Sequence, residues 1–351
     1  MEGILERNIQ GLRAIAAYMV VVHHILDTFA NNLGFHHPIN NMRTGGAGVD
    51  IFFVISGYIM MLTTSDRPIG PKRFLYNRII RIVPMYWLLT IVALILIAAG
   101  FKMFGQNPID VKRILTSFGF LPYFGSSGKV IDPILFPGWT LNYEMMFYIV
   151  FALCLLRHDV KFRILSVCCI LFCFWLAQVY IDDPLVDYLG ADVIIGFAAG
   201  IMLWRVSRHN IVSPVIAAGF CLLGVLALVM LDYPIPFPIP HARLIVIAGA
   251  LSIVFGAVCL ERHGIKIKDG WLMHEGNASY SLYLIHPFVL QFVAKVAKVM
   301  HFGGGYLASF GLAAVMLITS GVAARLLYSK LEQPLSEILK LSRRKANFVR
   351  T

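Results

Sequence analysis

The first long apolar stretch contains an arginine and a histidine whose side chains could take part in a reaction together. Arg13 and His24 are eleven residues apart, between residues 9 and 29. In an α-helix, eleven residues rise about 16 Å and make about three full turns, so both side chains lie on one face at two depths. A guanidinium group can bind an anion, and an imidazole can accept a proton from a hydroxyl group.

The neighbouring His23 points about 80° away from this face, so we expect His24 rather than His23 to take part in chemistry. Ionisable side chains inside an apolar helix are costly and are often functional. A structural role stays open, in which neighbouring helices satisfy both histidines.

Two more arginines precede the third apolar stretch. Arg78 and Arg81 are three residues apart and share one face of a helix. Guanidinium groups bind phosphate oxygens in pairs, so this spacing predicts a phosphate site. The alternative is a basic anchor at the membrane surface, beside the aromatic residues Tyr86 and Trp87.

A second set of polar residues occupies the opposite ends of two apolar stretches. Asp50 begins the second stretch, and Trp139, Asn142 and Glu144 begin the fourth. We expect these four residues to gather at the end of the bundle opposite to the arginines. A carboxylate at that depth needs a partner or a watery cavity, which favours a functional role for Glu144. For Asp50 the alternative is that it complements a helix dipole.

Tyr283 and His286 belong to a polar stripe, begun by Ser279, on one face of the ninth apolar stretch. We interpret the two residues as substrate contacts. The alternative is a row of hydrogen bonds between helices.

The helices that must position these residues form an all-α, polytopic integral membrane protein. Of 351 residues, 58% are hydrophobic and 14% are charged, and the mean hydropathy is +0.75. Soluble proteins carry about 25% charged residues. About ten stretches are long enough to cross a bilayer. They are residues 9–29, 47–64, 82–101, 139–157, 162–180, 189–205, 211–231, 243–261, 278–300 and 306–329.

The net charge of +11 follows from membrane topology. Most lysines and arginines fall in the connectors on the N-terminal side, which predicts that both termini are cytoplasmic. Attraction to anionic lipids accounts for the remaining positive charge. The sequence contains no basic soluble domain that could bind nucleic acid. All six cysteines fall inside the apolar stretches, so we expect neither disulfides nor a metal site.

These positions together predict a reaction. An anionic ligand would bind at the arginines, and a thioester on a thin arm could reach His24. A phosphate-rich donor such as an acyl-coenzyme A fits this description. The imidazole would remove the proton from an acceptor hydroxyl group, so the arrangement indicates acyl transfer across the membrane.

Over residues 1–335 the chain resembles acyltransferase family 3, the ten-helix membrane O-acyltransferases, and within it the exopolysaccharide-production acetyltransferases. Residues 336–351 would be a basic cytoplasmic tail. The motifs that carry the resemblance are Gly11–Arg13 with His24, Gly48–Gly57, Arg78–Trp87, Trp139–Glu144, Ser279–Pro287 and Glu332–Pro334. The sequence departs from many relatives at Tyr143, where they carry an acid, which leaves Glu144 as a single carboxylate.

The resemblance implies an enzyme of the bacterial cytoplasmic membrane that moves an acyl group, with acetyl as the default, from acyl-coenzyme A. The acceptor would be a hydroxyl group of an exopolysaccharide, a lipid-linked sugar or another envelope carbohydrate. The implied partners are the lipid bilayer and a polysaccharide assembly complex, and no cofactor would be bound permanently. The resemblance implies that His24 is the base, that Arg13 is its donor-side partner, and that Arg78 and Arg81 contact the coenzyme A phosphates. Glu144 and His286 match motif positions to which it gives no settled role. We predict Glu144 in catalysis with His24 and Arg13, and we predict five substrate-binding residues: Asp50, Trp139, Asn142, Tyr283 and His286.

Two other functions stay open from the residues alone. A transporter or flippase for a lipid-linked or anionic solute would also need buried polar groups, although no inverted repeat is visible. A non-catalytic subunit of a polysaccharide assembly complex is the third possibility.

Overall fold

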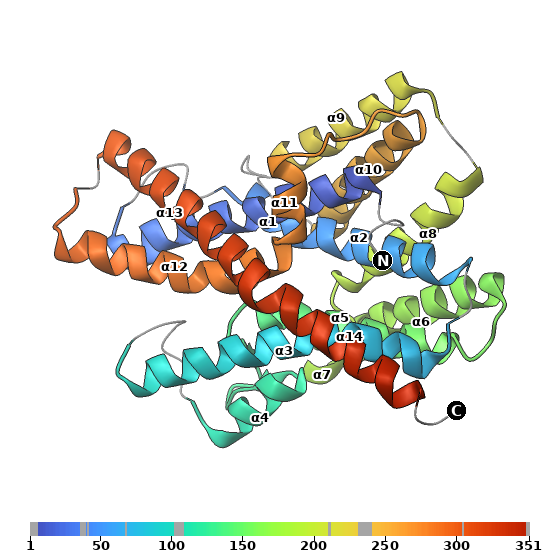
Figure 1. The fold of residues 1–351 in the computed structure, drawn as a ribbon, viewed down its shortest axis with the longest axis horizontal. Coiled ribbons are helices and arrows are strands. Elements are labelled where there is room, and N and C mark those ends of the chain that lie inside the picture. The colour runs from blue at the N-terminus through green and yellow to red at the C-terminus, as the bar shows by residue number, and fades with distance from the viewer. Residues whose placement is uncertain are drawn as a thin grey trace.

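The structure is a computed structural model that describes residues 6–348 except 36–39, 41, 67–68, 102–108, 210–211, 231–240 and 304. Long helices make up most of the molecule and cross one another at varied angles (Figure 1). In the described residues the one sheet is a short antiparallel hairpin, in which β1 (Tyr123–Phe124) pairs with β2 (Val130–Ile131).

Ten helices coincide with the ten predicted stretches. They are α1 (Arg7–Thr28), α2 (Gly48–Thr64), α3 (Pro71–Ala98), α5 (Gly138–Cys154), α6 (Val160–Tyr180), α8 (Ile194–His209), α9 (Pro214–Met230), α10 (Arg243–Arg262), α12 (Ser279–Val299) and α13 (Tyr306–Leu327). Four others are α4 (Val111–Gly119), α7 (Pro184–Leu189), α11 (Trp271–Asn277) and α14 (Gln333–Phe348).

The prediction of an all-α membrane protein is confirmed. Among the described residues, eight helical segments are long and apolar enough to cross a membrane. The remaining two predicted spans, α5 and α9, are helices of 17 residues. The count of ten spans and the cytoplasmic position of the termini therefore stay predictions. The third helix begins at Pro71, earlier than expected, so Arg78 and Arg81 lie inside it.

Helix α1 carries Arg13 and His24, and its N-terminal end is held by an acid from another helix. The amide N–H groups of Arg7 and Asn8 donate to the carboxylate of Glu261 at 2.8 and 2.7 Å. The first amides of a helix have no partner within it, and a negative charge there also complements the helix dipole. Glu261, near the end of α10, therefore fixes both the start and the tilt of α1.

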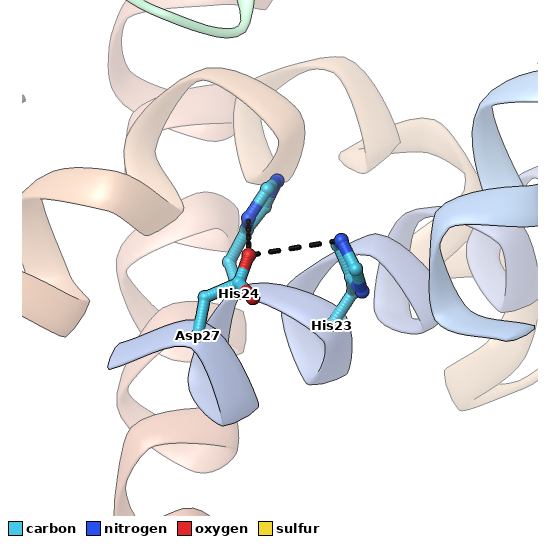
Figure 2. A group of neighbouring side chains, drawn as sticks. All are labelled: His23, His24 and Asp27. Carbon is cyan, nitrogen blue, oxygen red and sulfur yellow. Dashed lines mark hydrogen bonds and ion pairs between the residues drawn. The ribbon is translucent and has the colours of Figure 1, made fainter. Parts of the chain in front are cut away.

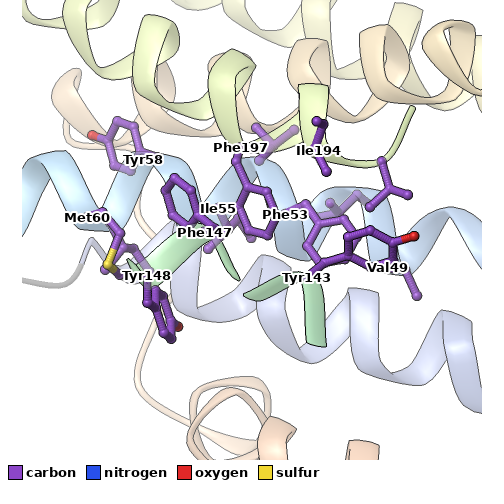
Figure 3. Close-up of a cluster of buried hydrophobic side chains, with 14 of the residues drawn as sticks. Val49, Phe53, Ile55, Tyr58, Met60, Tyr143, Phe147, Tyr148, Ile194 and Phe197 are labelled. Carbon is purple, nitrogen blue, oxygen red and sulfur yellow. The ribbon is translucent and has the colours of Figure 1, made fainter. Parts of the chain in front are cut away.

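Helix α2 lies at the centre of the core. Its apolar side chains pack against α5 and α8, and the rings of Phe147 and Phe197 stack with centroids 4.2 Å apart (Figure 3). Phe53 joins the same cluster, with its ring 4.7 Å from that of Phe197. This packing fixes α2, and with it Ser56 and Asp50, against the helices that carry the other site residues.

We expect Gly200→Ala to destabilise the protein by roughly 1–3 kcal/mol, because an added methyl group would overlap the Val54 carbonyl oxygen where α8 crosses α2. Thermal unfolding in detergent measures the effect. Gly219→Ala in α9 is the matched control, because nothing lies within 4 Å of its added methyl group. We expect this control to be neutral or slightly stabilising, and equal unfolding temperatures for the two variants would contradict the close helix contact.

The expected basic tail is largely helical. Helix α14 continues through the expected boundary at residue 335, runs across α3 (Figure 1), and accepts a hydrogen bond from the Tyr76 hydroxyl at the Leu339 carbonyl, 3.1 Å away. The division at residue 335 stays a prediction, and residues 349–351 lie outside the described part of the chain.

Candidate active site

The three predicted donor-side arginines line one cavity, which we call the arginine cavity. It encloses about 740 Å³ of empty space, including its mouth. Helices α1, α2, α3, α5 and α12 all contribute to its wall. The lining residues used below are Arg13, Ser56, Arg78, Arg81, Glu144, Tyr148 and Tyr283. The predicted convergence of Arg13 from one helix with Arg78 and Arg81 from another is confirmed.

Two of these guanidinium groups are buried. An Nη of Arg13 donates to the Gln10 side chain at 2.9 Å. In the described part of the chain the Nε of Arg78 has no hydrogen-bond partner, and its guanidinium carbon lies 5.5 Å from the Phe74 ring centroid. A buried charged donor without a partner is costly. The cavity is therefore prepared to receive an anion.

Glu144 lies in this arginine cavity and not with Asp50. Its carboxylate accepts hydrogen bonds from the Tyr148 hydroxyl and from Ser56, the latter at 3.3 Å. The prediction that it sits at the opposite end from the arginines is wrong. Helix α5 begins at Gly138, and six residues of helix carry Glu144 about 9 Å deeper, to the level of the arginines. Sequence reasoning assigned no part in the site to Tyr148 or Ser56.

Asp50 is engaged by a partner that the sequence analysis did not identify. Arg243, the first residue of α10, donates from Nε and Nη to the two carboxylate oxygens of Asp50 at 2.9 and 3.3 Å. Asp50 is buried, and the Arg243 guanidinium carbon lies 5.7 Å from the Trp139 ring centroid. The pair holds α2 against α10 beside Trp139, and a contact of Asp50 with substrate stays a prediction.

His24 lines a different cavity, which we call the histidine cavity. It has about 870 Å³ of empty space including its mouth. The side chain of His24 is 21% exposed, and its ring meets the edge of the Phe136 ring at 4.7 Å. The other polar residues of the wall are Asp27, Thr28, Asn31, Asn32, Asp132 and Gln291.

The imidazole of His24 has a carboxylate partner one helical turn along α1. Nδ1 of His24 lies 3.3 Å from Oδ2 of Asp27, and Nε2 of His23 lies 3.6 Å from the same oxygen (Figure 2). A carboxylate that accepts a hydrogen bond from one ring nitrogen fixes the orientation and the tautomer of the ring, so the other nitrogen keeps a lone pair and can act as a base. Sequence reasoning missed Asp27, although the spacing of three residues on a helix was a usable signal.

We expect Asp27→Asn to lower kcat about tenfold and to leave KM for the acyl donor unchanged, because the amide still occupies the space but no longer stabilises a protonated His24. Steady-state kinetics in detergent measures both constants.

His23, His24 and Asp27 also place three ligand atoms within 4.8 Å of one another, a group that could hold a metal ion. Loss of activity on chelation, with recovery on adding Zn²⁺, would contradict the proton-transfer role of the Asp27–His24 pair.

His286 and Tyr283 separate the two cavities. The His286 ring is fully buried and stacks on His24 at 5.3 Å, and the Tyr283 ring lies 6.1 Å from His286. The Tyr283 hydroxyl contacts Thr140 Oγ1 at 2.8 Å and faces the arginine cavity. Nδ1 of His286 lies 3.1 Å from the Leu282 carbonyl oxygen, and its Nε2 has no partner among the described residues. Tyr283 and His286 of the predicted stripe on α12 therefore lie between the arginine cavity and the histidine cavity.

The connector before α5 places Asp132 at the wall of the histidine cavity. Arg113 of α4 is buried and donates to the Asp132 carbonyl oxygen from Nε and Nη at 3.1 and 2.9 Å. Asp110 caps α4 through the Arg113 amide, and the hydrogen bonds from the Tyr123 hydroxyl and from this amide hold the pKa of Asp110 below its usual range. These bonds hold the described part of the connector, from Asp110 to Asp132, beside the histidine cavity.

Aromatic side chains line a third cavity, the aromatic groove, which meets the histidine cavity at Asp132. Trp139, Tyr143 and Tyr188 form its wall, and the two tyrosine rings stack at 4.7 Å. Asn142 lies buried nearby and donates to the Leu121 carbonyl at 3.4 Å. Trp139 thus lines a cavity, and substrate contact by Trp139 and by Asn142 stays a prediction.

Comparison with known proteins identifies relatives over most of the chain. A family model described as an acyltransferase domain matches residues 6–325. The chain is 34% identical over 316 residues to the exopolysaccharide production protein ExoZ of Rhizobium meliloti, covering 87% of this chain and 92% of that protein. It is 27% identical over 307 residues to the putative membrane-bound transacylase BcsY of Komagataeibacter xylinus, covering 80% and 72%.

A more distant similarity, at 26% identity, is to the peptidoglycan O-acetyltransferase OatA of Listeria monocytogenes, covering 60% of this chain and 35% of that protein. No solved structure is significantly similar to the chain.

Proposed function

Because the chain belongs to acyltransferase family 3 and is a membrane acyltransferase, we propose that it acylates a hydroxyl group of an exopolysaccharide or another cell-envelope carbohydrate. We propose acetyl as the acyl group and acyl-coenzyme A as its donor. The observation that carries this proposal is the pair of cavities, one cationic and one containing His24 with Asp27, on the two sides of the Tyr283–His286 layer.

The arginine cavity suits the donor. The phosphates of a coenzyme A head group would pair with Arg78 and Arg81, and Arg13 would add a third guanidinium group in the same cavity. Ser56 and Tyr148 keep the Glu144 carboxylate hydrogen-bonded within this wall, so it balances the cationic charge. The thioester then faces Tyr283, beyond which lies His24.

His24 would serve as the general base in the transfer itself. Its free ring nitrogen takes the proton of the acceptor hydroxyl, whose oxygen attacks the thioester carbonyl carbon. The carbon–sulfur bond breaks, an ester forms, and the coenzyme A thiolate takes up a proton. Asp27 stabilises the imidazolium that exists between these proton transfers. The thioester reaches His24 only when the Tyr283–His286 layer opens, so donor binding and opening of this layer are coupled.

The aromatic groove suits a saccharide acceptor. Flat rings such as Trp139 and Tyr143 offer apolar area with little loss of side-chain freedom, and the acids Asp132 and Asp187 accept hydroxyl hydrogen bonds. The groove and the histidine cavity lie next to each other, since Asp132 lines both. We propose that one saccharide chain occupies both, which would suit a polymeric or oligomeric acceptor.

We also propose that the enzyme lies in the bacterial cytoplasmic membrane with both termini inside. The excess of basic residues in the connectors on the N-terminal side supports this orientation. It would place the arginine cavity toward the cytoplasm, where acyl-coenzyme A is made, and the histidine cavity toward the outer side.

Purified protein in sealed vesicles tests the proposal. With acetyl-coenzyme A outside inside-out vesicles and the host's exopolysaccharide precursors in the lumen, we expect thiol release outside and acetylated saccharide inside, identified by mass spectrometry. Empty vesicles and heat-inactivated protein are the controls. Uptake of a solute without thioester consumption would favour a transporter, and unchanged polymer acylation in a deletion strain would contradict the assignment.

A further inference from the structure

A cleft on the side of the bundle has features that the acyl-transfer site does not use. It lies between the end of α3 and α12, with about 1230 Å³ of empty space including its mouth. We call it the lateral cleft. Its apolar wall consists of Leu96, Phe101, Phe288 and Phe292, and its cationic wall of Lys295 and Lys298.

The apolar wall faces the region that hydrocarbon chains would occupy. Both helices are long and apolar enough to cross a membrane. Phe292 is 70% exposed and Phe101 is 41% exposed, although each is a large apolar side chain. Exposed apolar surface of this kind on a spanning helix is covered by lipid, so an acyl or isoprenoid chain can enter the cleft sideways.

The cationic wall is unusual for its position. Lys295 and Lys298 are three residues apart on one face near the end of α12, on the side of the membrane for which the topology predicts few basic residues. The Lys295 ammonium group lies 4.3 Å from the Phe101 ring centroid, so its charge is held over the apolar wall. Two ammonium groups beside an apolar wall match an anionic head on a hydrocarbon chain.

The lateral cleft adjoins the cavity that contains His24. Asn32 and Gln291 line both the cleft and the histidine cavity, and the Asn32 amide donates to Gln291 Oε1 at 2.8 Å. Gln291 is four residues, about one helical turn, before Lys295 on α12. A molecule bound at the lysines can therefore extend polar groups past this amide pair to the base.

We propose that the lateral cleft binds the phosphate and the first isoprenoid units of a lipid-linked sugar, and so presents its saccharide to His24. This inference rests on the proposed acyl transfer, and it selects a lipid-linked acceptor over a free polymer. The lysines hold the phosphate, the phenylalanines hold the branched hydrocarbon, and Asn32 with Gln291 contacts the first sugar. A phospholipid could bind the same lysines through its phosphate, but it has no sugar to place between the cleft and His24.

Binding of undecaprenyl phosphate to the full-length protein in nanodiscs tests the inference. We expect it to displace a fluorescent analogue at concentrations at least about tenfold below those of dioleoylphosphatidic acid or of undecaprenol, which lack the isoprenoid chain and the phosphate respectively. We expect Lys295→Gln with Lys298→Gln to weaken binding at least about tenfold, and Lys295→Arg with Lys298→Arg to retain most of it.

Lys112→Gln, on the exposed face of α4, is the matched control and should bind undecaprenyl phosphate as the wild type does. Thermal unfolding shows whether each variant is folded. If the double glutamine variant is not folded, the double arginine variant still tests whether positive charge at positions 295 and 298 is enough for binding. Equal displacement by phosphatidic acid, or unchanged binding by a folded glutamine variant, would overturn the inference. Thioester consumption by the wild-type protein is measured in the same preparation, so a failure of the proposed function is seen separately.

Discussion

His24→Ala is expected to reduce acyl transfer at least about 100-fold, because a positioned general base typically contributes about 10²–10⁴-fold to a rate. His24 is the histidine whose ring faces the histidine cavity, with Asp27 on Nδ1. The alanine variant leaves a space at the wall of an already open cavity, so we expect the fold to persist. Thiol release and acetylated product measure the rate, and thermal unfolding measures the fold.

His23→Ala is the matched control, because the two histidines are adjacent and share the Asp27 carboxylate (Figure 2). The side chain of His23 instead packs toward Gly45, and we expect its loss to cost less than about tenfold in rate. Full activity of a folded His24→Ala protein would show that the base lies elsewhere. Equal losses for the two variants would indicate that Asp27 rather than His24 is the important group.

The second large effect is expected at the arginine cavity. Arg78→Gln with Arg81→Gln should raise KM for acetyl-coenzyme A at least about 100-fold, because each charge-assisted hydrogen bond to a phosphate contributes about 1.5–3 kcal/mol. The buried Arg78 guanidinium also lies over the Phe74 ring, so thermal unfolding is measured to show that the double variant is folded. Steady-state kinetics with the purified protein gives KM and kcat.

A truncated donor separates phosphate binding from other effects. S-acetylpantetheine has the thioester and the thin arm but no nucleotide, so its KM should be nearly the same for the wild type and the double variant. The KM of Arg78→Lys with Arg81→Lys for acetyl-coenzyme A should lie between those of the wild type and the double glutamine variant. Lysine keeps the charge but cannot make the paired hydrogen bonds of a guanidinium group. An equal rise of KM for both donors would mean that the arginines shape the cavity and do not bind phosphate.

Much of the fold follows from the sequence because one physical requirement dominates it. Backbone polar groups in a bilayer must be satisfied within each segment, so every long apolar stretch becomes a helix. The convergence of Arg13 with Arg78 and Arg81 could be anticipated as well, because helical spacing and basic composition both place them at one end.

The partners across helices could not be anticipated. The start of α5 was anticipated to within one residue, but α3 begins eleven residues earlier than expected, so Arg78 and Arg81 lie deeper and reach the level of Glu144. Arg243 pairs with Asp50 from 193 residues away, and no local pattern in either helix specifies that contact. The spacing of three residues could have suggested that Asp27 contacts His24. The sequence does not show that a cavity lies beside His24, and this cavity is the reason to assign Asp27 a role.

The closed contact between Thr140 and Tyr283, with His286 stacked beside it, has a consequence for the host cell. An energised membrane stores a proton gradient, and a continuous aqueous passage through an enzyme would discharge it. Among the described residues, the stacked rings of His24 and His286 and the hydroxyl pair of Thr140 and Tyr283 lie between the two cavities, so we expect this layer to prevent such a passage. A proton leak in vesicles that carry Tyr283→Ala, absent with the wild-type protein, would reveal this barrier.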